Sequence, residues 1–104
     1  MLPTAVMASN DQVALGVMLV LARSGVRVPE DVSLTGYDDS RMARLSSVDL
    51  TTVRQDPGLM GAAAVEAAVR RIDRPDSRPR ETVVEPTLVV RGSTMPPRAE
   101  PRSG

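Results

Sequence analysis

The sequence contains no cysteine, no histidine, no phenylalanine and no tryptophan, and its single aromatic residue is Tyr37. Without cysteine there is no disulfide and no thiol nucleophile. Without histidine, a common zinc ligand and the usual proton shuttle at neutral pH are also missing. One aromatic side chain offers little surface to stack on a base, a flavin or a sugar ring. The composition therefore argues against zinc enzymes, thiol enzymes and sites built on aromatic stacking.

An excess of charge of one sign is also lacking. The 13 basic residues are all arginine, they are spread along the chain, and they are balanced by 13 acidic residues. Nucleic-acid-binding surfaces usually carry a basic stripe, so we expect this chain alone to bind DNA poorly. The apolar run from Val13 to Ala22 is about half as long as a membrane span of roughly 20 residues. With no cysteine and no signal-peptide pattern, we expect a cytoplasmic protein.

Apolar runs bounded by turn and cap residues indicate alternating strands and helices. The first strand, helix and strand occupy about 35 residues, which is the length of a βαβ unit with parallel strands and a right-handed crossover. The sequence predicts strands at 4–8, 32–37, 50–54, 81–84 and 87–91, helices at 10–23 and 57–72, and a short helix or loop at 38–45. From Met95 onward proline, arginine, serine and glycine dominate, which predicts a disordered tail over 95–104.

The first predicted helix is apolar on all sides between Val13 and Ala22. A helix on the surface of a sheet usually keeps one polar face, so this helix is expected to be buried on more than one side. One side can pack on the sheet of its own chain. A chain of 104 residues has little material left to cover the other side, and we therefore predict that it lies in a dimer interface.

Polar residues follow three of the predicted strands, with Asn10 after the first, Asp38 after the second and Gln55 after the third. Ligands of open parallel sheets bind beyond the carboxyl ends of the strands. Amide and carboxylate groups there suit a ligand with many hydroxyl groups. The alternative is purely structural, because Asn10, Asp38 and Asp56 could each cap a helix N-terminus.

Other kinds of chemistry find no support in the sequence. The pair Asp38–Asp39 could belong to a metal or phospho-acceptor pocket, but a receiver domain would also need a lysine, and the chain has none. There is no phosphate-binding glycine loop, and Ser9 has no histidine or lysine partner. We therefore expect no enzyme activity, no catalytic residue, no metal and no cofactor.

Four motifs occur together in the order of a known family. They look like the C-terminal third of LacI/GalR-type (lactose-repressor-like) transcriptional regulators, and jointly they cover about residues 4–94. The motifs are AVMASNDQVALG at 5–16, GVRVPEDVSLTGYDD at 25–39, LTTVRQ at 50–55 and LVVRGST at 88–94. At Ser47–Asp49, where members of this family often carry prolines, the sequence departs from the pattern.

This resemblance implies a class I periplasmic-binding-protein-like α/β fold with parallel βαβ layers. It implies that Asn10, Asp38 and Gln55 bind a small-molecule effector, a sugar or another small polar ligand. It also implies a homodimer, with an interface formed by residues of the first helix and of the segment after the second strand. The interface residues are Val13, Val17, Val20, Leu21, Met42 and Leu45.

The resemblance further implies a division between two subdomains. Residues 1–55 and 87–94 would form the C-terminal effector-binding subdomain, and 56–86 would be an excursion belonging to an N-terminal subdomain. Operator DNA would be bound only through an N-terminal head that lies outside this sequence. Two alternatives remain open at this point: part of a periplasmic sugar-binding transport protein, or a self-associating piece without independent activity.

Overall fold

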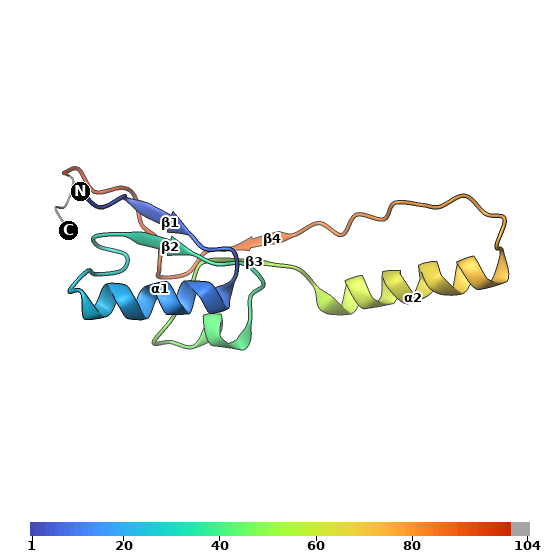
Figure 1. Cartoon of the computed structure of the whole chain (residues 1–104), viewed down its shortest axis with the longest axis horizontal. Coiled ribbons are helices and arrows are strands. Elements are labelled where there is room, and N and C mark those ends of the chain that lie inside the picture. The colour runs from blue at the N-terminus through green and yellow to red at the C-terminus, as the bar shows by residue number, and fades with distance from the viewer. Residues whose placement is uncertain (101–104) are drawn as a thin grey trace. The chain divides into compact units, whose positions relative to one another are not determined.

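The structure is a computed structural model that describes residues 1–100, and the chain forms two compact units (Figure 1). Unit 1 consists of residues 1–54 together with the chain from Thr87 onward, and unit 2 consists of residues 55–86. Within residues 1–100, no helix is long and apolar enough to cross a membrane.

Unit 1 begins with a βαβ arrangement, as the sequence predicts. Strand β1 (Ala5–Met7) pairs in parallel with β2 (Ser33–Thr35), and α1 (Asp11–Arg23) connects them. The helix starts at Asn10, whose side chain caps it, and stops at Ser24. Gly25 follows with φ of 72°, a left-handed conformation that glycine adopts without steric cost after a helix end. Local capping and glycine chemistry thus set both helix ends.

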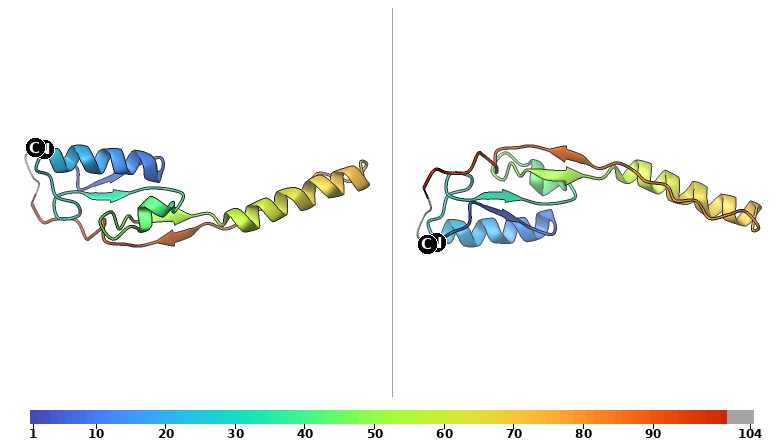
Figure 2. Two further views of the ribbon diagram at one scale, coloured as in Figure 1. Left: turned by 90° about the horizontal axis from the view of Figure 1, so that it is seen from below. Right: turned by 90° about the horizontal axis from the view of Figure 1, so that it is seen from above.

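Two further strands extend unit 1. After the 3₁₀ helix η1 (Arg41–Arg44), β3 (Thr52–Arg54) runs parallel to β2, joined through a bridge between Thr35 and Thr51. Strand β4 (Thr87–Val89) pairs antiparallel with β3. Figure 2 shows the four strands in the spatial order β1, β2, β3, β4. Since β1, β2 and β3 are parallel, their carboxyl ends share one edge of unit 1, which we call the carboxyl edge.

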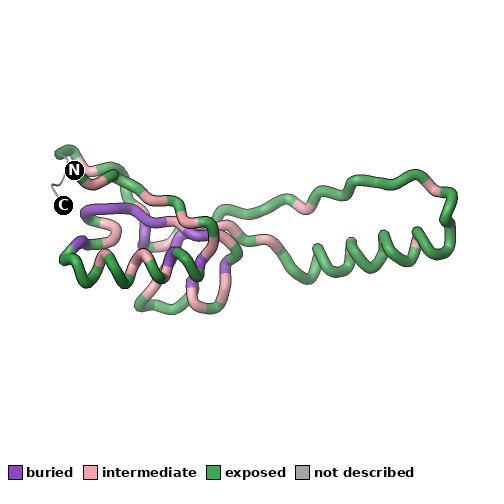
Figure 3. Tube along the Cα trace, viewed as in Figure 1, coloured by how far each residue is buried: buried purple, intermediate pink, exposed green. Residues whose placement is uncertain are grey.

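The apolar core lies in unit 1, around β2. Its fully buried side chains come from α1, β2, η1 and the chain before β3, namely Ala14, Leu34, Ala43 and Leu50. Figure 3 shows the buried residues gathered around these elements. Burial of apolar surface stabilises by about 25 cal/mol per Å², so this small cluster provides the main driving force for folding of unit 1.

Unit 2 contains the helix α2 (Pro57–Asp73), in which no residue is buried. Asp56 caps the helix, accepting hydrogen bonds from the backbone N–H groups of Gly58 at 3.0 Å and Leu59 at 3.1 Å. The predicted strand at 81–84 is wrong, because these residues form no strand. A strand needs a neighbouring strand for its backbone hydrogen bonds, and α2 is the only regular element described within residues 55–86.

The tail predicted as disordered over 95–104 lies partly within the described residues. Its first residue, Met95, donates its backbone N–H to Ser33 Oγ at 3.1 Å. The Arg98 guanidinium donates to the backbone oxygens of Leu2 at 2.7 Å and of Asp31. These contacts attach the segment to the start of β2 and the beginning of the chain. Residues 101–104 lie outside the described residues.

Candidate functional site

Asn10 follows β1 at the carboxyl edge, with Ala8 and Ser9 between them. Its side-chain Oδ1 accepts a hydrogen bond of 2.8 Å from the backbone N–H of Val13, so the capping role that the sequence suggested is confirmed. Capping engages only the oxygen of the amide. The NH₂ group of a half-buried Asn10 remains a donor suited to a ligand hydroxyl, so capping and ligand binding are compatible at this residue.

Asp38 follows β2 at the same edge and is exposed. Its backbone N–H donates to Val53 O at 2.9 Å, with φ of 115°, and the next residue, Asp39, has φ of 55°. The capping alternative for Asp38 is wrong, because Ser40 occupies the N-cap position of η1. Positive φ at two successive non-glycine residues costs roughly 1–3 kcal/mol each and is common at functional sites. This turn leaves Asp38 exposed at the carboxyl edge.

Asp11 ties the two loops together, a role that the sequence analysis missed. It is 2% exposed, and its backbone N–H donates to Tyr37 O at 3.0 Å. Its carboxylate accepts hydrogen bonds of 2.6 Å from Ser40 N and from Thr52 Oγ1. Gly36 is an indirect sign of this contact in the sequence, because a Cβ at that position would run into the Asp11 carboxylate. Asp11 therefore fixes the start of α1 against the segment after β2 and the first residue of β3.

Asp39 lies buried beside this network and pairs with three arginines. The distances from its carboxylate are 2.7 Å to Arg91, 3.2 Å to Arg44 and 4.0 Å to Arg54. Burial by itself would raise the pKa of Asp39, but hydrogen bonds and charges from Arg91 and Arg44 outweigh it, so the pKa lies below the usual value. Asp39 is therefore an ionised structural group beneath Asp38. Across residues 1–100, no three or more carboxylates gather as a metal site would require.

The third predicted effector residue, Gln55, is the half-buried first residue of unit 2 and comes directly after β3. Asp56, the next residue, is engaged as the cap of α2, as one of the two sequence alternatives held. The structure thus brings Asn10 and Asp38 to one edge of unit 1, and Gln55 follows that edge in sequence.

The predicted interface residues lie on α1 and on η1 with its flank. Val13, Val20 and Leu45 have exposed fractions of 46%, 60% and 56%. The other three, Val17, Leu21 and Met42, are half-buried. The stripe on α1 has the i, i+4, i+7, i+8 spacing of one helix face, so unit 1 presents an apolar helix face to its surroundings.

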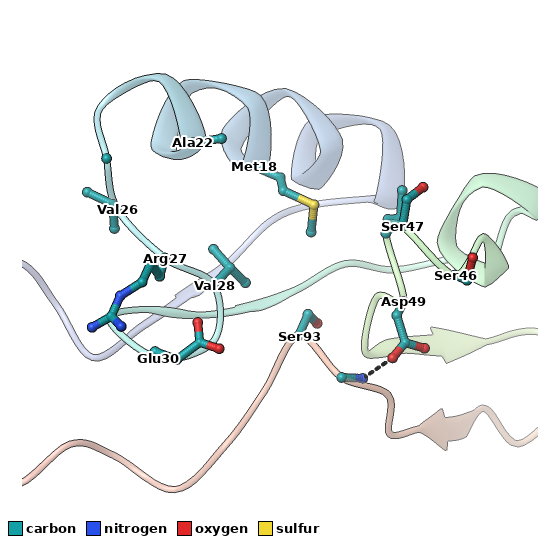
Figure 4. A pocket seen from close by; sticks show the side chains of 13 residues that line it. Met18, Ala22, Val26, Arg27, Val28, Glu30, Ser46, Ser47, Asp49 and Ser93 are labelled. Carbon is teal, nitrogen blue, oxygen red and sulfur yellow. Dashed lines mark hydrogen bonds between the residues drawn. The ribbon is translucent and has the colours of Figure 1, made fainter.

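A cleft of about 570 Å³ opens near the amino ends of β2 and β3, away from Asn10 and Asp38. Figure 4 shows its walls, with Met18 from α1, Val28 from the loop before β2, and Ser93 from the segment after β4. Charged Glu30 and Asp49 also line it, and Asp49 accepts a hydrogen bond from Gly92 N at 3.0 Å. None of the three predicted effector residues lines this cleft.

Fold and site together define an α/β domain of the periplasmic-binding type, with parallel strands whose carboxyl edge carries the polar residues Asn10 and Asp38. Residues 1–94 match the model of the family described as "Periplasmic binding protein-like domain", and the chain belongs to this family.

The chain is also similar to known LacI-type transcriptional regulators. It is 41% identical over 91 residues to the ribose operon repressor of Haemophilus influenzae, covering 88% of this chain and 27% of that protein. The crystal structure of a LacI transcriptional regulator from a Rhodococcus species superimposes with a TM-score of 0.83 at 46% identity, covering 90% of this chain and 34% of the other. A complex of the transcriptional regulator CelR with cellobiose superimposes with a TM-score of 0.81 at 41% identity. This match covers 86% of this chain and 28% of the other.

These matches confirm the resemblance and the fold class that the four motifs predicted. The proteins that the chain resembles are transcriptional regulators, and the chain spans about a quarter of the length of the curated relative.

Proposed function

We propose that this chain is the effector-binding and dimerisation portion of a LacI-type transcriptional regulator, and that its effector is a sugar or a sugar-like polar molecule. The observation that carries the proposal is the carboxyl edge, where the Asn10 amide and the exposed Asp38 carboxylate follow adjacent parallel strands. The bond from Asp11 N to Tyr37 O, 3.0 Å long, fastens their loops to each other.

The chemistry of these two groups matches a sugar. An ionised carboxylate accepts hydrogen bonds from two neighbouring hydroxyl groups, and such charge-assisted bonds are about twice as strong as neutral ones. The Asn10 NH₂ group supplies donors for a ring or hydroxyl oxygen. Two of the similar proteins support this ligand class, since one is a ribose operon repressor and the other is in complex with cellobiose.

The roles of Gln55 and of the interface rest on the family resemblance. Gln55 is proposed as a third effector residue, with an amide that both donates and accepts. The apolar stripe from Val13 to Leu21, with Met42 and Leu45, is proposed as the surface that joins two copies of the regulator. The basic and acidic residues of the sequence balance each other, so we assign operator binding to an N-terminal head of the regulator and not to these residues, and we place the regulator in the cytoplasm.

A ligand panel tests this proposal. The natural polypeptide that contains residues 1–104 is titrated by calorimetry with pentoses, hexoses, disaccharides and, as a non-sugar comparison, purine bases. We expect one sugar to bind with a Kd on the order of micromolar, about −8 kcal/mol. If only a purine base binds, the proposed sugar effector is wrong and the effector is a nucleobase. If no ligand gives binding heat at millimolar concentration, effector binding itself is contradicted.

A further inference from the structure

Strands β2 and β3 pair directly only toward their carboxyl ends. There the backbone N–H of Gly36 donates to Thr51 O and that of Asp38 to Val53 O, each at 2.9 Å. In a regular parallel ladder the next bonds toward the amino ends would run from Thr51 N to Leu34 O and from Leu34 N to Asp49 O. Ser93, from the segment after β4, mediates both of these connections.

The backbone of Ser93 stands between Leu34 and Asp49. Leu34 N donates to Ser93 O at 2.9 Å, and Ser93 N donates to Asp49 O at 3.1 Å. The side chain relays the other connection, because Ser93 Oγ accepts from Thr51 N at 2.8 Å and donates to Leu34 O at 2.6 Å. Ser93 is 2% exposed, and both bonds of its hydroxyl group are buried.

This position requires a small residue with a hydroxyl group. Only a hydroxyl both donates and accepts in so little space, and an alanine would leave a buried N–H and a buried carbonyl without this partner. The residue before it is Gly92, where a Cβ would displace the exposed Asp49 carboxylate from its present position. The small size of these residues and the hydroxyl group of Ser93 therefore suit insertion between two strands.

Two residues before Ser93, Arg91 contacts both the chain before β3 and the turn after β2. Its backbone N–H donates to Thr51 Oγ1 at 2.9 Å, and its guanidinium donates to Leu50 O at 3.0 Å. The same guanidinium lies 2.7 Å from the carboxylate of Asp39, next to Asp38. One short segment thus holds β2 and β3 at the amino end and the strained turn at the carboxyl edge.

We propose that Ser93 is a positioning residue that sets the spacing of β2 and β3 and, together with Arg91, holds the turn that presents Asp38. The link to effector binding rests on the function proposed above, whereas the structural role does not.

A matched pair of variants tests this role in the 104-residue chain. Ser93→Thr keeps the hydroxyl group, and Ser93→Val has nearly the same shape without it. We expect the Thr51 amide to exchange with deuterium at least about tenfold faster in the Val variant, because its hydrogen-bond acceptor is lost. We also expect the amide resonances of Asp38, Asp39 and Ser40 to shift in the Val variant and to stay near their original positions in the Thr variant.

Each outcome decides one part of the proposal. Equal protection of the Thr51 amide in both variants would overturn the hydroxyl relay, and unchanged resonances at residues 38–40 in the Val variant would overturn the positioning role. If the Val variant does not fold, Ser93→Ala compared with the original chain is judged by the same criteria. Neither measurement uses a ligand, so both test the structural role of Ser93 even if the protein binds no sugar. In a sugar-binding regulator the Val variant should bind at least tenfold more weakly than the Thr variant.

Discussion

Two buried aspartates, Asp11 and Asp39, hold the carboxyl edge of unit 1, and they are stabilised differently. Asp11 accepts two hydrogen bonds of 2.6 Å, from Ser40 N and Thr52 Oγ1. Asp39 pairs with arginine guanidinium groups. Asp38, next to Asp39 in the sequence, is exposed. The carboxylates that stabilise the turn are therefore different from the carboxylate that is accessible to a ligand.

The Asp39 ion pairs predict a pH-dependent stability. Since the folded-state pKa of Asp39 is lowered, its stabilisation is present above the unfolded value of about 3.9 and is lost as the pH falls below it. We expect Asp39→Asn to destabilise the chain by about 2 kcal/mol at pH 7, because breaking a buried ion pair leaves charge uncompensated. The difference from the original chain should shrink below pH about 4.

Urea unfolding at pH 7, 5 and 3 measures this difference. Asp76→Asn, at an exposed aspartate in unit 2, is the control and should change stability little at any of these pH values. A constant gap between Asp39→Asn and the original chain from pH 7 to pH 3 would show that the carboxylate charge of Asp39 is not what stabilises the turn.

At the scale of single residues, local chemistry could be predicted and long-range partners could not. The N-cap roles of Asn10 and Asp56 follow from residue type and from the helix that begins next to each of them. The partners of Asp11 and Ser93 lie 29 to 59 residues away in sequence. Such contacts form only when the sheet closes, and nothing in the local pattern specifies them.

Among the elements, α1 carries the clearest unexplained surface. Its inner side packs Ala14 against the core, while Val13 and Val20 on another side are 46% and 60% exposed. The sequence predicted burial on more than one side from the apolar character of the whole helix. Within one chain the helix is buried on one side, and the exposed apolar side is what the proposed dimer would cover.

This surface predicts the behaviour of a charged variant. If two copies associate through α1, Val20→Glu should raise the dimer dissociation constant about 100-fold, equivalent to about 3 kcal/mol, because a carboxylate would be buried without a partner. Sedimentation equilibrium at several concentrations measures it. Gln12→Glu, at an exposed polar position of the same helix, should leave association unchanged. An original chain that stays monomeric at all concentrations would contradict the α1 interface.

The elements also show where pattern reading succeeds and fails. Helices α1 and α2 were located closely because each has a cap residue and a stop signal next to a long apolar pattern. The apolar segment 81–84 has the composition of a strand but no partner strand. A helix satisfies its backbone hydrogen bonds within its own segment, whereas a strand depends on residues elsewhere, so composition alone over-predicted it.

At the scale of the whole molecule, the chain consists of a unit with a buried core and a unit without one. Residues 55–86 contain no buried residue, and Leu59, Val65 and Ile72 on α2 are exposed by 60% or more. Family resemblance predicts a C-terminal subdomain of residues 1–55 and 87–94 and an excursion over 56–86, and this division stays a prediction; the compact units of the structure are bounded at Gln55 and Thr87. The assignment of 56–86 to an N-terminal subdomain stays a prediction.

The most direct test of the account is calorimetry of Asp38→Ala in the natural polypeptide that contains residues 1–104, with the best sugar from the panel. Loss of charge-assisted hydrogen bonds worth about 1.5–3 kcal/mol should weaken binding roughly 10- to 100-fold. Asp76→Ala, which removes an exposed aspartate in unit 2, should bind with the original affinity. Equal affinity of Asp38→Ala and the original protein would contradict effector binding at the carboxyl edge.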